Sequence, residues 1–287
     1  MPTTSFRELP LPRSHLLLPH DGPAASARRI WAMVLRYWYL IRSSWPRAAE
    51  LIYWPLVQML MWGFLQTHLA QTSSYYAHAG GLMIGAVLLW DILVRGQLGY
   101  SVPFLEEMWS RNLGNLLMSP LKPAELIVAL MIVSLVRLVI GVGPVLVLAY
   151  LFFGFNILGL GAGFALFFAC LMLTSWALGL VGTGVVLRYG LGAESFIWLA
   201  VFVLLPVACV YYPVTTLPRW LQPVAWALPP TYVFEGLRAL MTQQVLRADL
   251  MLRAFLIDAV WLAAAGLFFQ RLLRSARLNG GLLRLGE

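Results

Sequence analysis

The feature that most constrains this sequence is a series of six long apolar segments separated by shorter polar connections. Each segment holds about 20 residues or more, the length that an α-helix needs to cross the hydrocarbon core of a bilayer. Open sheets leave backbone groups unsatisfied in lipid, so segments of this kind are expected to be helical. We therefore predict an all-α integral membrane protein with six transmembrane helices. The predicted spans are 47–67, 79–100, 124–153, 160–187, 194–212 and 250–273.

Composition supports a membrane protein over a soluble one. The chain is 61% hydrophobic and only 11% charged, whereas soluble domains carry about 25% charged residues. The net charge of +8 would suggest nucleic acid in a soluble protein, but in a membrane protein an excess of basic residues in cytoplasmic loops explains it better. We expect no nucleic-acid partner. Both cysteines, Cys170 and Cys209, lie in apolar segments and are interpreted as small packing residues.

The N-terminal region divides into a tail and an amphipathic segment. Residues 1–27 are rich in proline and are predicted to form a flexible cytoplasmic tail, as are residues 278–287 at the other end. Residues 28–44 place their arginines on one helical face, opposite aliphatic residues and tryptophan, which is typical of an interfacial helix. The alternative, the start of the first span, would put four costly arginines in lipid. These arginines are Arg28, Arg29, Arg36 and Arg42.

The longest polar stretch between two apolar segments is 101–123. Ser101 can cap a helix and Pro103 fits its first turn, which predicts that a new helix begins there. Glu107 and Arg111 are four residues apart and would share a face of that helix. The sequence therefore predicts a short amphipathic helix between two spans, held by a partner protein.

The first predicted span carries polar or aromatic side chains at every fourth position, which we interpret as one helical stripe. Lipid tolerates such a stripe poorly, so it is expected to face protein or a cavity. It either lines a pathway or dimer interface, or it holds helices together through its glutamines. The stripe consists of Glu50, Trp54, Gln58, Trp62 and Gln66.

Four further charged residues fall inside predicted spans. Asp91 and Arg95 are one turn apart and are expected to neutralise each other, with a proton relay at Asp91 as the alternative. Arg137 lies near the middle of the third span and needs a partner or water, and Asp91 is the nearest candidate partner in depth. Asp258 is the one acid expected to be buried in the last span.

Residues 213–247 are apolar but are cut by five prolines into pieces too short to span a bilayer. Such pieces are typical of short re-entrant or interfacial helices. The chain has no GxxxxGK[ST] phosphate loop and no HExxH motif, and its four histidines have no metal-ligand neighbours in sequence. We assign no catalytic, cofactor-binding or metal-binding residue to it.

The run FLEEMWSRNLGNLLMSPLKPAELIVA resembles the cytoplasmic coupling-helix region of ABC-2 type transporter permeases. The resemblance extends over about 28–277, which would be one transmembrane domain. It implies the membrane subunit of an ABC exporter, paired with a second permease subunit as a homodimer. It also implies two cytoplasmic ATPase subunits, which would bind ATP and magnesium. The implied coupling residues are Phe104, Glu106, Glu107, Met108, Trp109 and Arg111.

From this resemblance we expect a multi-pass protein of the bacterial inner membrane with both termini in the cytoplasm. An aromatic, weakly polar pathway fits a lipid, a lipid-linked glycan or a hydrophobic small molecule as substrate. The alternative is an integral membrane enzyme acting on lipids through Asp91, Glu50 or Asp258; a channel or a structural membrane protein is a third. Purification would discriminate, because a permease carries an ATPase with it and a lipid enzyme turns over alone.

Overall fold

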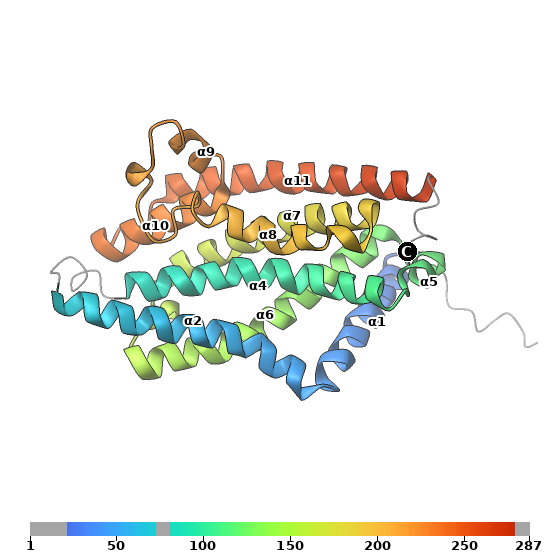
Figure 1. Ribbon diagram of the computed structural model, residues 1–287, viewed down its shortest axis with the longest axis horizontal. Helices are drawn as coiled ribbons and strands as arrows, with labels where there is room; N and C mark the ends of the chain where they lie inside the picture. The colour runs from blue at the N-terminus through green and yellow to red at the C-terminus, as the bar shows by residue number, and fades with distance from the viewer. Residues whose placement is uncertain (1–21, 73–80, 279–287) are drawn as a thin grey trace, which may run out of the picture.

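A computed structural model describes residues 22–72 and 81–278 of the chain, and every regular element in those residues is a helix (Figure 1). Five of the helices are long and apolar enough to cross a membrane: α2 (Trp45–Thr72), α4 (Leu82–Trp109), α6 (Pro123–Phe153), α7 (Ala162–Tyr189) and α11 (Ala248–Leu278). The shorter elements are α1 (Pro23–Arg42), α5 (Leu113–Met118), η2 (Ile157–Leu160), η3 (Leu191–Ala193), α8 (Ser195–Leu204), η4 (Val214–Thr216), α9 (Gln222–Trp226) and α10 (Pro229–Gln243).

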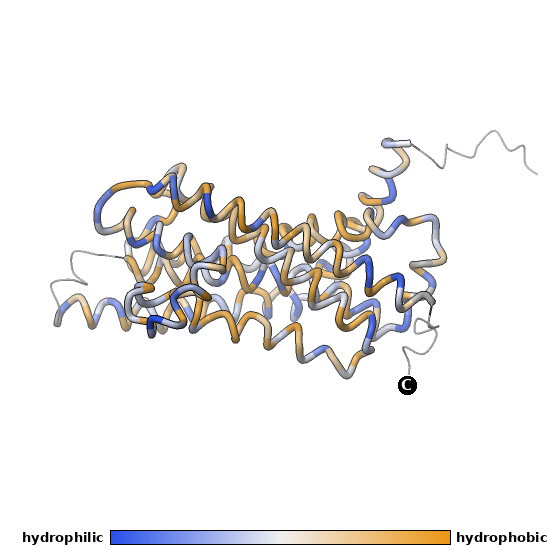
Figure 2. The backbone as a smooth tube through the Cα atoms, turned by 90° about the horizontal axis from the view of Figure 1, so that it is seen from above, coloured by the Kyte–Doolittle hydropathy of each residue, from blue (hydrophilic) through white to orange (hydrophobic). Residues whose placement is uncertain are grey.

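The long helices lie side by side along the long axis of the molecule (Figure 1). One end carries α1, α5 and the C-terminal part of α11, and we call it the α5 end. The opposite end carries α9 and α10, and we call it the α10 end. Figure 2 shows hydrophobic residues along the length of the bundle, with much of the hydrophilic character near its two ends. That distribution suits a bundle whose middle lies in hydrocarbon.

Helix α4 is the central element and packs against α2, α6, α7, α8 and α10. It approaches α6 closely at Gly99, where an added Cβ atom would lie 3.1 Å from the Cα atom of Ser134. Ser175 of α7 donates a hydrogen bond to the Leu93 carbonyl of α4 at 2.9 Å. Small residues thus let neighbouring helices approach closely, as is common in membrane bundles.

The buried apolar side chains form two main clusters. The cluster toward the α10 end includes Leu89, Phe167 and Phe234, and the cluster toward the α5 end includes Tyr100 and Phe104. Helix α4 contributes to both clusters, so it connects the two halves of the interior. Helix α2 is the least buried of the five candidate spans and packs on α4 and α6.

Several predicted boundaries are wrong. The N-terminal helix begins at Pro23 and not at Arg28, so the end of the predicted tail is helical; residues 1–21, 73–80 and 279–287 lie outside the described residues. No new helix starts at Ser101, because α4 continues through Pro103 to Trp109. Proline removes one backbone hydrogen bond, but burial of the residues around it stabilises the helix.

The fifth predicted span, 194–212, does not form one long helix. Helix α8 has 10 residues, about 15 Å of helix, against the ~30 Å of a bilayer core. Turns follow it, and Pro206 lacks the amide hydrogen that would continue the helix. The chain from Glu194 to Val214 nevertheless runs from the α5 end toward the α10 end (Figure 1). This predicted span is therefore a short helix followed by turns, and not one continuous membrane-spanning helix.

The proline-rich segment forms short helices, as its composition predicts. Pro229 and Pro230 occupy the first turn of α10, where their missing amide hydrogens cost nothing. The first nine residues of α10 are almost entirely buried and pack on α7 and α11. Arg238 of α10 donates to the Cys209 carbonyl at 2.6 Å and thereby holds the preceding loop. It also donates to Glu235, one turn earlier on the same helix, at 3.2 Å.

Candidate functional site

The connection between α4 and α6 forms an exposed tip at the α5 end. Helix α4 ends where Arg111 adopts a left-handed backbone conformation, with φ of 52°. The short helix α5 follows, and α6 begins at Pro123. Trp109 is 48% exposed and Met118 is 81% exposed, and the polar residues between them include exposed Ser110 and Asn115. We call 109–120 the tip.

The structure divides the six predicted coupling residues between the interior and the surface. Phe104 and Met108 are buried in the core, because the unbroken helix places these positions in the apolar cluster toward the α5 end. Trp109 and Arg111 are exposed and belong to the tip. Arg111 does not share a helical face with Glu107 as predicted, because the helix ends before it.

Glu107 is buried and joins α4 to α1. Its carboxylate accepts hydrogen bonds from Arg36 at 2.9 Å and from the Asn112 side chain at 2.7 Å. Tyr37 lies beside it; burial, and then the negative charge of Glu107, raise the pKa of the Tyr37 hydroxyl above its usual range. Glu107 is therefore an internal contact and not a surface charge.

Glu125 makes a second contact between α1 and a span. Both of its oxygens bind Arg29, at 2.8 Å to Nε and 2.6 Å to Nη2, and Ser26 donates to the same carboxylate. The backbone amide of Lys122 donates to it at 3.0 Å, which caps the start of α6. Sequence reasoning did not select Glu125, although an acid in the first turn after a proline was a usable signal.

These two ion pairs change the interpretation of α1. Its basic face was predicted to lie at a membrane surface, but Arg29 and Arg36 bind carboxylates of α6 and α4. Val34 and Ile41 pack into the protein, whereas Trp31 remains 59% exposed. Helix α1 is thus fastened to the two helices that flank the tip.

Arg137 finds a different partner from the predicted one. Its guanidinium lies 3.8 Å from Glu106, whose carboxylate is also 3.8 Å from Arg47 of α2. Glu50 lies within electrostatic range of Arg137. Long arginine side chains extend toward polar surroundings at a membrane edge, which explains why Arg137 reaches toward the end of α4 and not toward Asp91. Helices α2, α4 and α6 meet at this charge cluster.

Asp91 is the least satisfied acid in the described part of the chain. It is 0% exposed, and neither carboxylate oxygen has a hydrogen-bond partner there. Arg95, its predicted partner, lies within electrostatic range of Asp91 but supplies it with no hydrogen bond. Tyr211, which stacks on Trp62 at a centroid distance of 4.4 Å, lies near enough to sense the Asp91 charge.

The predicted stripe on α2 does not face one environment. Glu50 and Trp54 are exposed, Gln58 and Trp62 are half-buried, and Gln66 is buried. A four-residue repeat on a helix of 3.6 residues per turn rotates by about 40° at each step, so its ends face different sides. The Gln66 side chain accepts hydrogen bonds from the backbone amides of Met83 and Ile84, at 2.9 and 3.2 Å, and thereby caps α4.

Asp258 has partners within the bundle. Thr174 of α7 donates to it at 2.7 Å and the Cys170 thiol donates at 2.9 Å. These bonds join α7 and α11, the most extensively packed pair of helices. Asp258 is therefore satisfied where Asp91 is not. Cys170 is buried as predicted, and it also supplies a hydrogen bond.

Comparison with known proteins gives one positive result. Residues 28–242, about three quarters of the chain, match the family described as ABC-2 type transporter. A search of curated proteins found no match. The matched range contains most of α1, the tip and the spans that meet at the charge cluster. Membership implies a multi-pass membrane protein that associates with an ABC ATPase subunit. The chain belongs to the ABC-2 type transporter family.

Proposed function

We propose that the chain is the permease subunit of an ABC exporter, with two copies forming the pathway and two separate ATPase subunits binding ATP and magnesium. In this arrangement the α5 end lies in the cytoplasm of a bacterial cell, the protein lies in the inner membrane, and both termini are cytoplasmic. The observation that carries the proposal is the tip, 109–120, which is exposed at its surface and tied through its flanking helices to α1.

Ion pairs on both sides of the tip support a role in coupling. Glu107 and Glu125 fasten the helices before and after the tip to one helix, α1. The Trp109 indole donates to Glu194 at 2.9 Å, which adds a link to the start of α8. A force applied at the tip would therefore move α1, α4 and α6 together. Rigid-body motion of this kind is how ATP-driven closure can switch a pathway between two states.

The tip offers the kind of surface that a cytoplasmic partner binds. Met118, at the end of α5, and Trp109, at the end of α4, are both exposed, and the residues between them in sequence include exposed polar Ser110 and Asn115. Interfaces commonly combine an apolar centre with a polar rim, and a few such anchors carry most of the binding energy. We place the ATPase contact on these residues and not on buried Phe104 and Met108.

The exposed face of α2 and the polar groups behind it support a pathway for an amphiphilic substrate. Tyr53, Trp54 and Met61 are more than half exposed, although they lie on a candidate span. On the same helix, half-buried Trp62 stacks on Tyr211, which lies within electrostatic range of the unsatisfied carboxylate of Asp91. A second copy of the chain would face this side. Lipids, lipid-linked glycans and hydrophobic small molecules all combine an apolar part with a polar one, and these are the substrate classes that we propose.

Co-purification with an ATPase tests the coupling proposal. The Met118→Asp variant adds a charge at the centre of the proposed contact without touching the core. Loss of one anchor typically costs about 2 kcal/mol, so we expect roughly 30-fold weaker retention of a co-expressed ATPase subunit. Thr215→Asp, at an exposed position of η4 at the other end, is the matched control. Equal retention by both variants would remove the tip from the contact.

A further inference from the structure

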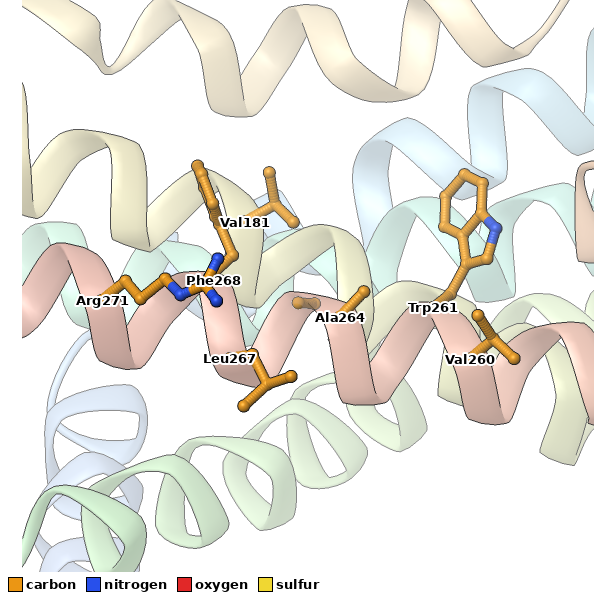
Figure 3. A pocket seen from close by; sticks show the side chains of 8 residues that line it. Val181, Val260, Trp261, Ala264, Leu267, Phe268 and Arg271 are labelled. Carbon is orange, nitrogen blue, oxygen red and sulfur yellow. The ribbon is translucent and has the colours of Figure 1, made fainter.

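An apolar groove lies on the surface of α11, on the side of the bundle that packs on α7 and not on α2. Its volume is about 650 Å³. Val260, Ala264 and Leu267 recur at helical spacing along it, and Val181 of α7 contributes to its wall. The groove is hollow at Ala264 because Trp261 and Phe268, on either side, are much larger (Figure 3).

A cation marks one end of the groove. Arg271 lies at the end opposite Val260 and Trp261 (Figure 3). Its side chain is exposed, and among the described residues no carboxylate forms an ion pair with it. Arg274, also exposed, follows one turn later on α11. The groove therefore joins an apolar channel about 17 Å long, from Val260 to Arg271, to an uncompensated positive charge.

We infer that this groove binds an anionic phospholipid, with one acyl chain along Ala264 and the phosphate at Arg271. Charge complementarity selects the headgroup, because basic residues beside apolar grooves at the edge of a span attract acidic lipids. The position of the groove favours an acyl chain as its apolar occupant. Val260 to Phe268 belong to a candidate span, whose outer face would meet hydrocarbon in a membrane. The site is separate from the α2 face and does not depend on the identity of the transported substrate.

A phospholipid explains features that a second protein copy does not. The lining is almost entirely apolar over one helix, while the cation lies only at the end nearest the α5 end. A phospholipid has this same division between a long apolar part and one compact anion. A helix from another copy would instead require small or polar residues repeated along the whole contact.

Native mass spectrometry of the full-length chain tests the inference. Phosphatidylglycerol and phosphatidylcholine with identical acyl chains are titrated against the purified protein. We expect the wild-type chain to retain phosphatidylglycerol more strongly. Arg271→Gln should weaken phosphatidylglycerol binding about fivefold while leaving phosphatidylcholine unchanged, and Arg271→Lys should restore the preference. Arg253→Gln, an exposed arginine near the other end of α11, is the control.

The acyl half of the site has its own variant. Ala264→Phe fills the hollow from an exposed position and should weaken both lipids, without the charge selectivity of Arg271→Gln. The inference is overturned if Arg271→Gln behaves like Arg253→Gln. It is also overturned if a cysteine at Leu267 forms disulfides between copies in native membranes, because the groove would then be covered by protein. Loss of ATPase contact at the tip would leave these lipid results unchanged, so the two proposals fail separately.

Discussion

Arg36 Nη2 lies 2.9 Å from Glu107 Oε2, and this contact joins α1 to the last turn of α4. Glu107 is buried, whereas Arg36 is partly exposed. Loss of the pair would therefore cost Glu107 more than Arg36. A buried carboxylate without a partner has lost its hydration and gains nothing in return, whereas an exposed guanidinium is still hydrated. The pair also fixes the helix that leads into the tip.

Glu107→Ala removes the acceptor for both Arg36 and Asn112. We expect a loss of about 2 kcal/mol of stability, since hydrogen bonds to a charged group contribute about 1.5–3 kcal/mol each in favourable cases. Thermal unfolding of the purified protein in detergent measures it. Asp249→Ala, which breaks the exposed pair with Arg247, should cost much less stability than Glu107→Ala, because solvent screens an exposed pair. Equal losses of stability in the two variants would show that the buried contacts of Glu107 stabilise the protein no more than the exposed pair does.

The crossing of α4 and α6 depends on the missing side chain of Gly99. A Cβ atom there would lie 3.1 Å from the backbone of Ser134, and backbone moves less readily than a flexible side chain. Gly99→Ala is therefore expected to destabilise the protein by about 1–3 kcal/mol. Gly143→Ala, on α6 with no atom within 4 Å of the added carbon, should be neutral or stabilising. The unfolding temperatures of the two variants give the comparison.

Asp91 and Asp258 should respond in opposite ways to neutralisation. Asp91→Asn removes a buried charge that has no hydrogen-bond partner in the described residues, so we expect unchanged or greater stability. Asp258→Asn disturbs an acid that accepts from Cys170 and Thr174, and stability should fall by about 1 kcal/mol or more. If Asp91→Asn is the less stable of the two, a partner for Asp91 must exist in the membrane-embedded protein.

The orientation of the bundle can be read with single cysteines. Asn115 is exposed on the tip and Thr215 is exposed on η4 near the opposite end. An impermeant thiol reagent applied to intact cells should label Thr215→Cys, while Asn115→Cys should react only after the cells are opened. Labelling of both positions from the same side would mean that 194–214 does not cross the membrane.

The outward face of α2 is expected to meet a second copy. Met61 is 56% exposed and lies one residue before half-buried Trp62, which stacks on Tyr211 of its own chain. Met61→Cys should therefore crosslink between copies more readily than Trp62→Cys. Labelling of Met61→Cys by lipid-phase probes without any crosslink would assign this face to lipid instead.

The sequence alone determines the parts of the protein that depend on local chemistry. Long apolar segments specify the five long helices, and α6 and α7 begin within a few residues of their predicted starts. The prolines of 213–247 limit the helices of that segment to short ones, because proline interrupts a helix interior. The amphipathic character of 28–42 is likewise evident from residue spacing, since it depends only on the period of a helix.

Tertiary structure decided the neighbours of each polar group. Arg29 and Glu125 are 96 residues apart and Arg36 and Glu107 are 71 apart, so no local pattern joins them. Periodicity shows which side chains share one face of a helix, but it does not show which other helix packs against that face. For this reason the sequence predicted a partner protein as the contact of Glu107 and Asp91 as the contact of Arg137. Burial also overrode the helix-start signals at Ser101 and Pro103, because packing of the residues beyond them stabilises an unbroken α4 more than one lost hydrogen bond destabilises it.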